Sequence, residues 1–432
     1  MTDAIAGAIL DRTELMRRAG DFVLAHPELG HRERRCAAYL AEVFAGLGLA
    51  VERPFGDLET AFTATLQGAE PGPRIGIALL YDAVPTVTED GAYAPNHACG
   101  HNVISGAVVG AMAALADLSP RGSVVVMGLP GDEIGAPRVM EIGGGKALTA
   151  ATGAWDDFDA VLYAHPEFEN AVSRRSRWME RYCVALHHPR RYRQRGETRG
   201  SVPWAVAALL DGIRAFEESD GQEFVMIKDL RLDGDVEDGC RISARLRVLL
   251  FGLDKADLAR RAERFEAVVG AVGADAGLSI DCGRVGAPTM GVKANEALIA
   301  VVHEAMTAAG LAVTSDPEPL PFATDFGNIS WRAPGALIGI GRQGGWKFHA
   351  PEGARDFAGE AGHEAMRIMA EVLVRAVLRL WVDDDALDRV RADFQMTRSR
   401  ASRRGAAGGT TREHDTTDGP IGGEGNSRQP RR

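Results

Sequence analysis

Short runs of apolar residues alternate along the chain with longer stretches whose apolar residues recur at helical intervals. The short runs have the length of buried strands, and each ends at Gly, Pro, Asp or His residues. Strands that alternate with helices are typical of an α/β fold, in which helices sandwich a largely parallel sheet. The predicted strands are 75–80, 124–127, 161–162 and 336–340, and the predicted helical stretches are 4–25, 36–47, 104–115, 296–309 and 364–381.

The middle of the chain has a different pattern. Residues 241–251 (RISARLRVLLF) alternate apolar and basic positions, as in a half-buried strand with one solvated face. A second strand is expected at 179–186, and helices are expected at 202–216 and 258–269. We therefore predict a smaller inserted α+β domain. The predicted limits are 1–178 with 290–395 for the discontinuous main domain, and 179–289 for the insertion.

The last segment, residues 396–432, is rich in Gly, Arg, Thr and Ser and has almost no large apolar residue. Such a segment buries too little surface to offset the entropy lost on ordering. We predict a disordered tail.

Composition narrows the class of protein. The length of 432 residues predicts two domains, and a net charge of -11 argues against a nucleic-acid binder, which needs a basic surface. No signal peptide and no apolar run of about 20 residues is evident, so no membrane association is expected. The five cysteines are widely spaced, which suits a reducing compartment. The expected location is the cytoplasm.

Residues with metal-binding or acid–base side chains follow several predicted strands. Asp82, the pair Asp132-Glu133 and His165 each come directly after an apolar run. Chemistry in open α/β sheets gathers beyond the carboxyl ends of the strands. This placement carries more weight than any single residue.

Two features of the sequence supply donors for a cation. In HACGHN (97–102), a thiol and an imidazole two residues apart, Cys99 and His101, can face one cation across a Gly bend. The alternative is a buried thiol beside helix-capping histidines. In Asp132-Glu133, one carboxylate can bind metal while the other acts as general base, or the pair is a solvated turn.

Two single histidines complete the candidate set. His165 and His349 are each compatible with an ordinary core or surface histidine, but the set as a whole favours a metal site. Asp82 is expected to orient a ligand imidazole, or else to be a turn residue before Pro85. The candidate metal ligands are Cys99, His101, Glu133, His165 and His349.

These motifs resemble those of the aminoacylase/carboxypeptidase metallopeptidases, in particular the branch of auxin-conjugate and aminobenzoyl-glutamate amidohydrolases. The similarity runs in the family's order over about residues 10–392. The matching stretches are HPELGHRE (26–33), YDAVP (81–85), HACGHN (97–102), GLPGDE (128–133), His165-Pro166, NEAL (295–298), ATDFGNIS (323–330) and FHAPEG (348–353).

The resemblance implies a catalytic α/β domain interrupted by a lid that mediates dimers or higher homo-oligomers. It implies one or two metal ions per protomer on the five ligands named above. It also implies that Asp132 is the general base that activates a water, and that the substrate is a small molecule.

Two positions depart from the family pattern. The base is usually Glu in a GTPAEE-like motif, but here it is Asp132, whose side chain is one methylene shorter. Aligned on Pro203, the lid histidine of the family's His-Ala-Ala-x-Pro segment is replaced by Arg199. That histidine stabilises the oxyanion of amide hydrolysis, and losing such a donor costs about a hundredfold. With a shifted alignment, His187 or His188 takes this role.

The departures favour a reaction other than amide hydrolysis. Among such reactions, the resemblance to members of this family that replace an aromatic amine with a hydroxyl group implies an aminohydrolase that converts 5-nitroanthranilate to 5-nitrosalicylate and ammonia, in which Arg199 binds a carboxylate or nitro oxygen. One alternative is an amidohydrolase acting on N-acyl amino acids or aminobenzoyl-glutamate. Another is an inactive family member that serves as a binding protein. The expected metal is Mn²⁺, with Zn²⁺ as the alternative because of the Cys ligand.

Overall fold

The computed structural model describes residues 2–87, 92–118, 121–187, 202–220, 224–235 and 241–407. The chain divides into two compact units, Met1–Phe394 and Gln395–Arg432. Two separate sheets of four or more strands lie within the described part of the first unit.

The larger sheet has seven strands in the order β1-β2-β6-β3-β7-β13-β8. Its four central strands, β6, β3, β7 and β13, are parallel, and the outer pairs are antiparallel. All four strands predicted from apolar runs belong to this parallel centre, which confirms the predicted fold class. The bounds are β1 (Ala50–Glu52), β2 (Phe62–Gln67), β3 (Glu70–Leu80), β6 (Arg121–Leu129), β7 (Ala160–Pro166), β8 (Ala171–Val172) and β13 (Gly335–Ile340).

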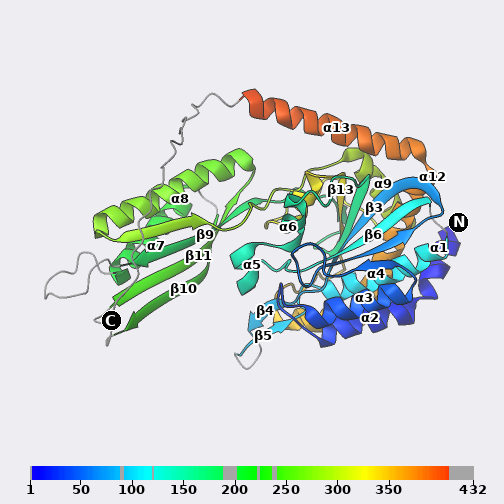
Figure 1. The fold of residues 1–432 in the computed structure, drawn as a ribbon, viewed down its shortest axis with the longest axis horizontal. Helices are drawn as coiled ribbons and strands as arrows, with labels where there is room; N and C mark the ends of the chain where they lie inside the picture. The colour runs from blue at the N-terminus through cyan, green and yellow to red at the C-terminus, as the bar shows by residue number, and fades with distance from the viewer. Residues whose placement is uncertain are drawn as a thin grey trace, which may run out of the picture. The chain divides into compact units, whose positions relative to one another are not determined.

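Helix α4 (His101–Ala116) is the centre of the helical layer (Figure 1). Its residues from His101 to Leu115 are all buried, as expected for a helix that is apolar on every side. It packs against β3 and β7 and against α2 (Thr13–Ala25) and α12 (Glu360–Val382). A Cβ at Gly106 would lie 2.6 Å from the backbone oxygen of Met16 on α2, so this position requires glycine.

The other elements of the first unit are shorter or more peripheral. Helices α6 and α10 pack on each other, and α10 packs against β7 and β13. The bounds are α1 (Thr2–Leu10), α3 (Arg34–Gly46), β4 (Val84–Val87), β5 (Tyr93–Asn96), α5 (Pro137–Ile142), α6 (Gly145–Ala151), α9 (Glu296–Ala308), α10 (Phe326–Ser330) and α11 (Pro351–Ala358).

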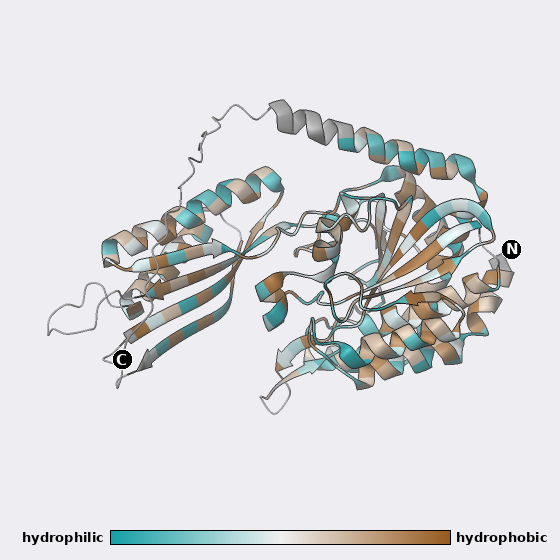
Figure 2. Cartoon of the chain, in the orientation of Figure 1, coloured by the Kyte–Doolittle hydropathy of each residue, from teal (hydrophilic) through white to brown (hydrophobic). Residues whose placement is uncertain are grey.

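A separate four-stranded antiparallel sheet has its own hydrophobic core. Its order is β10-β11-β9-β12, and helices α7 and α8 lie along one of its faces (Figure 1). Brown and teal residues alternate along these strands in Figure 2, as expected for a sheet with one buried face. The bounds are β9 (Trp178–His187), α7 (Val202–Asp220), β10 (Val225–Asp235), β11 (Arg241–Gly252), α8 (Lys255–Ala276) and β12 (Ser279–Arg284).

Leu246 lies at the centre of this second core. It is fully buried, whereas its neighbour Arg245 on β11 is exposed. We expect Leu246→Ala to lower the free energy of unfolding by about 2–5 kcal/mol, because it leaves a cavity among the side chains of α7 and α8. Urea denaturation measures this change. Arg245→Ala is the control, and a similar loss there would contradict the assignment of the buried face.

The segment predicted to be a disordered tail, residues 396–432, begins within a helix of the structure. Helix α13 (Asp384–Ala407) continues through residues 396–407. This stretch contains Arg, Ala and Met, which are good helix formers, and no proline. A shortage of apolar residues prevents packing into a core, but it does not prevent a helix. The rest of the predicted tail, residues 408–432, lies outside the described residues.

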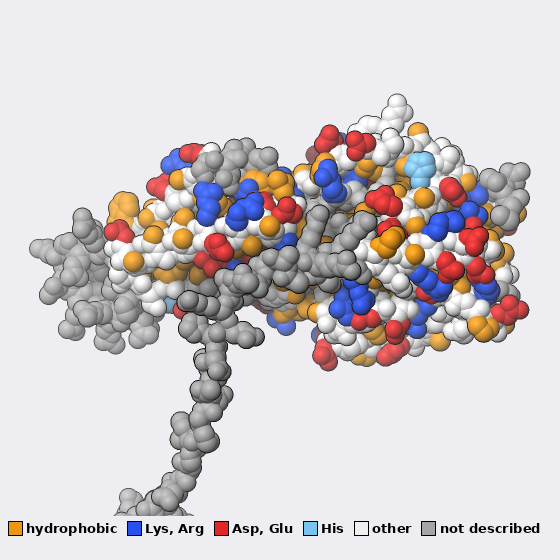
Figure 3. Space-filling model, turned by 90° about the horizontal axis from the view of Figure 1, so that it is seen from above, with side chains coloured by type: hydrophobic (Ala, Val, Ile, Leu, Met, Phe, Trp, Pro, Cys, Tyr) orange, Lys and Arg blue, Asp and Glu red, His pale blue; other side chains and the backbone are white. Residues whose placement is uncertain are grey.

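The described surface carries both signs of charge. Basic and acidic side chains are interspersed on the face seen in Figure 3. Among the described residues, no helix is both long and apolar enough to span a membrane.

Candidate metal centre

The candidate site lies where the central parallel strands end. Asp82 comes two residues after β3, Asp132 and Glu133 follow β6, and His165 is the penultimate residue of β7. Because β6, β3 and β7 are neighbours and parallel, their carboxyl ends meet at one edge of the sheet. The polar residues that follow these strands along the chain therefore lie close together, as predicted.

Cys99 and His101 reach the same place through a sharp bend before α4. Gly100 between them has a φ of 81°, in the left-handed region that favours glycine. A Cβ at Gly100 would lie 2.8 Å from side-chain atoms of Phe357 and Pro166. Any other residue at this position would displace the bend that turns the thiol and the imidazole toward each other.

All five predicted ligands converge. One donor atom from each of Cys99, His101 and His165 lies within 4.8 Å of the other two, and the same holds for Cys99, Glu133 and His349. Donors placed about 2.0–2.3 Å from a cation are separated by less than about 4.6 Å, so each group has nearly the spacing of a coordination shell. The shared member is Cys99, so the two groups form one continuous centre.

Asp82 fixes the orientation of two of these donors. Its backbone carbonyl oxygen is 2.7 Å from Nδ1 of His101 and its Oδ1 is 2.9 Å from the same nitrogen, while its Oδ2 accepts the backbone N–H of Glu133 at 2.9 Å. With Nδ1 engaged, His101 presents Nε2 to the centre. Burial alone would lower the pKa of His101, but Asp82 and Asp132 outweigh it and raise the pKa well above its usual value.

His165 is oriented in a similar way by the backbone. Its Nδ1 is 2.5 Å from the carbonyl oxygen of Pro166, and its Nε2 is 3.6 Å from Sγ of Cys99. Burial, together with the nearby His101, lowers the pKa of His165 to about 3. The imidazole is therefore neutral near pH 7, which is the form that binds a cation.

Two buried polar atoms of the five predicted ligands have no hydrogen-bond partner among the described residues. They are Nε2 of His101 and Oε1 of Glu133. Buried polar atoms are almost always paired, because leaving one unpaired is costly. A divalent cation would satisfy both atoms, so the residues fit a metal. A donor set of thiol, imidazoles and carboxylate suits Zn²⁺ or Mn²⁺.

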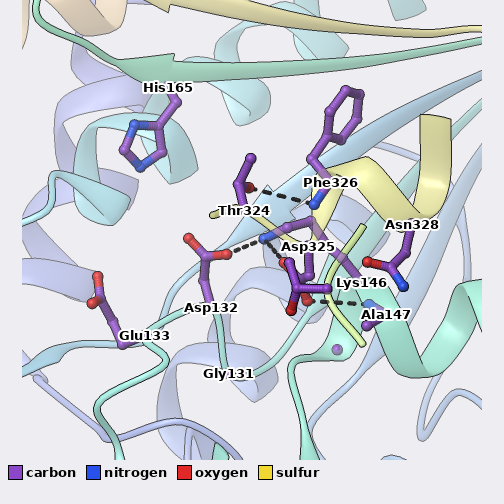
Figure 4. A network of polar contacts seen from close by, with 12 residues as sticks. Gly131, Asp132, Glu133, Lys146, Ala147, His165, Thr324, Asp325, Phe326 and Asn328 are labelled. Carbon is purple, nitrogen blue, oxygen red and sulfur yellow. Dashed lines mark hydrogen bonds and ion pairs between the residues drawn. The ribbon is translucent and has the colours of Figure 1, made fainter. Parts of the chain in front are cut away.

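The sequence did not point to a buried lysine beside Asp132. Lys146 lies between Asp132 and Asp325 and contacts Oδ1 of Asp132 (Figure 4). Its Nζ is 2.9 Å from Oδ1 of Asp325. Burial would raise the pKa of Asp132, but Lys146 and His101 outweigh it and hold the pKa well below its usual value. The GGG that precedes Lys146 and the ATDFGNIS stretch with Asp325 were the available signals.

A cavity of about 880 Å³ opens onto this centre. Cys99, Asp132, Glu133, His165 and His349 all line it. Its other walls carry aromatic rings and two positively charged side chains that are not among the predicted metal ligands. These residues are Phe168, Phe322, Phe348, Phe251, Arg177 and Lys228. The cavity therefore suits a small molecule with apolar and anionic parts.

Arg199 and the alternative His188 lie outside the described residues, so the role of Arg199 and the predicted dimer stay predictions. The other alternative, His187, is exposed at the end of β9, with Nε2 3.8 Å from Asp281. It does not line the cavity of its own chain.

Comparison with known sequences gives a consistent result. The model of Peptidase family M20/M25/M40 matches residues 81–379. The Xaa-Arg dipeptidase of Mus musculus is 36% identical over 161 residues, which are 34% of this chain and 33% of that protein. A p-aminobenzoyl-glutamate hydrolase component of Escherichia coli is 32% identical over 162 residues, 34% of this chain and 31% of that protein. The alignments with these relatives span about one third of their length.

Solved structures show the same fold over most of the chain. The aminobenzoyl-glutamate utilization protein of Klebsiella pneumoniae has a TM-score of 0.67 at 16% identity, with 88% of this chain and 100% of that chain covered. A dinuclear metal binding peptidase of the M20 family from Bacillus subtilis has a TM-score of 0.61 at 19% identity, with 87% and 99% covered. At these identities the likeness concerns the fold.

Proposed function

The chain belongs to peptidase family M20/M25/M40, whose model matches residues 81–379, and on this premise we propose that it is a metal-dependent hydrolase of C–N bonds. The supporting observation is the convergence of five donor side chains on one edge of the parallel sheet, two of them with unpaired buried atoms. We assign Cys99, His101, Glu133, His165 and His349 as the metal ligands.

The surrounding residues have separate tasks in this reaction. When bound, a divalent cation supplies Lewis-acid chemistry that lowers the pKa of a water and polarises the carbon under attack. Asp132 accepts a proton from the attacking water and transfers it to the departing nitrogen. A C–O bond forms, the C–N bond breaks, and the nitrogen leaves as an amine or as ammonia. Asp82 holds His101 in position throughout.

For the substrate we propose a small aromatic anion, with 5-nitroanthranilate as the specific candidate. Hydrolysis would give 5-nitrosalicylate and ammonia, with water as the only other reactant. The aromatic rings and the two cations that line the cavity support this class of substrate. The departures at Asp132 and Arg199 support a reaction in which charge develops away from a carbonyl oxygen.

The second candidate is hydrolysis of an amide bond in an N-acyl amino acid or an aminobenzoyl-glutamate. The supporting observation is the sequence similarity to an Xaa-Arg dipeptidase and to a component of a p-aminobenzoyl-glutamate hydrolase. Such substrates also carry a carboxylate that the positively charged side chains of the cavity, Arg177 and Lys228, can bind. A third candidate, an inactive binding protein, has less support because the donor set is complete.

A substrate screen separates these candidates. The protein is stripped with a chelator, reconstituted with Mn²⁺ or Zn²⁺, and incubated with 5-nitroanthranilate, N-acyl amino acids and p-aminobenzoyl-glutamate. Release of ammonia and 5-nitrosalicylate supports the first candidate, and release of a free amino acid supports the second. Absence of turnover with every substrate and both metals contradicts the proposed activity.

Lys228 is the residue to which we assign recognition of the substrate anion. The pairing of β10 with β11 passes from Ile227 opposite Val248 to Asp229 opposite Arg247, so Lys228 is the extra residue of a β-bulge. Bulges change the direction of a side chain and are frequent beside active sites. Lys228 lines the cavity, and its partial burial lowers its pKa.

We expect Lys228→Met to raise KM for an anionic substrate about tenfold, the equivalent of about 1.4 kcal/mol of binding. The value of kcat should stay within about a factor of two, because Lys228 is not one of the residues assigned to the chemical step. Steady-state kinetics measures both values. Arg231→Met, on the same strand but not lining the cavity, is the control. An unchanged KM in Lys228→Met would refute the assignment.

A further inference from the structure

A buried chain of charges lies directly behind Asp132. Lys146 comes from α6, Asp325 immediately precedes α10, and their side chains meet under the Asp132 carboxylate (Figure 4). The Lys146 and Asp325 side chains are only 1% and 5% exposed. The sequence distance between these residues and Asp132 shows that the fold, and not a local turn, brings them together.

Asp325 is held in place from two sides. Its Oδ1 is 2.9 Å from Nζ of Lys146, and its Oδ2 accepts the N–H of Ala147 at 3.1 Å. It thus holds both the side chain of Lys146 and the start of the helix that carries it. A Cβ at Gly144 would lie 2.3 Å from Oδ2 of Asp325, so only glycine permits this approach.

Lys146 in turn holds one carboxylate oxygen of Asp132, and the other oxygen points toward the ligand centre. Lys146 contacts Oδ1, while Oδ2 is 3.5 Å from Nε2 of His101, on the side of the ligand centre. The ring of Tyr163, 5.1 Å from Nζ, closes another side of the lysine. The carboxylate therefore has little freedom to rotate away from the centre.

We propose that Lys146 and Asp325 are positioning residues that hold the short Asp132 side chain so that Oδ2 reaches the attacking water. This inference rests on the proposed function, because it concerns the residue assigned as general base. Asp places its carboxylate one methylene nearer to the backbone than Glu does, and general-base catalysis depends on close contact with the proton. The Lys146–Asp325 pair supplies the precise support that this shorter side chain requires.

The competing interpretation is that the buried charges serve only the stability of the fold. Buried ion pairs are weak evidence for stability, because desolvation offsets much of their attraction. The two interpretations predict different kinetics. A stabilising role affects the fraction of folded enzyme, whereas a positioning role affects the turnover of enzyme that is folded and loaded with metal.

The test is a double-mutant cycle with Asp325→Asn and Asp132→Asn in the reconstituted full-length protein. We expect Asp325→Asn to lower kcat by about 10- to 100-fold, since a misplacement of about 1 Å has an effect of this size. KM should change by less than about twofold. The metal content, measured by elemental analysis, should be unchanged. In the Asp132→Asn background, Asp325→Asn should cause no further loss of kcat.

The control is Glu371→Gln, which breaks a buried ion pair with Arg375 in α12, away from the cavity. It should lower the melting temperature without changing kcat. If Asp325→Asn does not fold, Lys146→Arg, which keeps the positive charge but changes the geometry, is measured in the same cycle.

Three outcomes would overturn the inference: an unchanged kcat, the same loss in both backgrounds, or a loss explained by missing metal. Failure of the proposed function has a different signature, because wild-type protein would then show no turnover. A wild-type enzyme that works, with additive effects of the two substitutions, rejects only the positioning role.

Discussion

His101→Ala removes both the bound metal and the activity. His101 is fully buried, Asp82 fixes its ring, and its Nε2 is one of the two unpaired atoms at the centre. Loss of a group that merely orients a ligand costs about 10- to 100-fold in metal affinity or activity, so the loss of the donor itself should exceed this. We expect kcat/KM to fall by at least about a thousandfold.

Elemental analysis after gel filtration measures the metal, and steady-state kinetics measures the activity. His303→Ala is the matched control, because His303 is exposed on α9 and does not line the cavity. The control should keep its metal and its kcat. A His101→Ala protein with full metal content and full turnover would remove the basis of the proposed site. If His101→Ala and His303→Ala both lack turnover but bind the same small molecules, the third candidate, a binding protein, gains support.

Asp132→Asn separates turnover from metal binding. Asn has nearly the same shape as Asp, but it cannot accept a proton from the attacking water. General-base catalysis contributes about 10²- to 10⁴-fold, and we expect kcat to fall within that range. Because Asp132 is not among the five assigned ligands, the metal content should be unchanged.

The control for Asp132→Asn is Asp156→Asn, which alters a carboxylate on the surface that pairs with Arg332. Its kcat should equal that of the wild type. A large loss of metal in Asp132→Asn would indicate that Asp132 is itself a ligand. An unchanged kcat would show that another group accepts the proton.

Much of the site could be predicted because it depends on strands that the sequence shows clearly. The apolar runs before Asp82, Asp132 and His165 form neighbouring parallel strands. Once these strands are recognised, their ends must lie together. The parallel arrangement thus converts a one-dimensional pattern into a cluster of donors.

Lys146 and Asp325 could not be found in this way. A lysine near the start of a short helix is ordinarily on the surface, and its burial depends on two carboxylates that are distant in sequence. The run of three glycines before Lys146 indicated that the backbone there approaches other groups closely, and the ATDFGNIS stretch was the signal for Asp325.

Strand β10 was not predicted because its sequence pattern is irregular. Its sequence VMIKDLRLDGD does not keep a strict alternation of apolar and polar residues, because the bulge at Lys228 shifts the pattern by one position. A regular alternation would have made the strand recognisable. The irregularity that hides it is also what directs Lys228 into the cavity.

The order of the donors along the chain has a consequence for biosynthesis. Strand β13 lies between β7 and β8 in the sheet, and His349 follows it, after the whole four-stranded sheet has been made. A nascent polypeptide that still lacks residues 335–349 has no β13 beside β7 and no His349. On the proposed assignment of His349 as a ligand, we expect complete metal binding only after most of the chain has been synthesised.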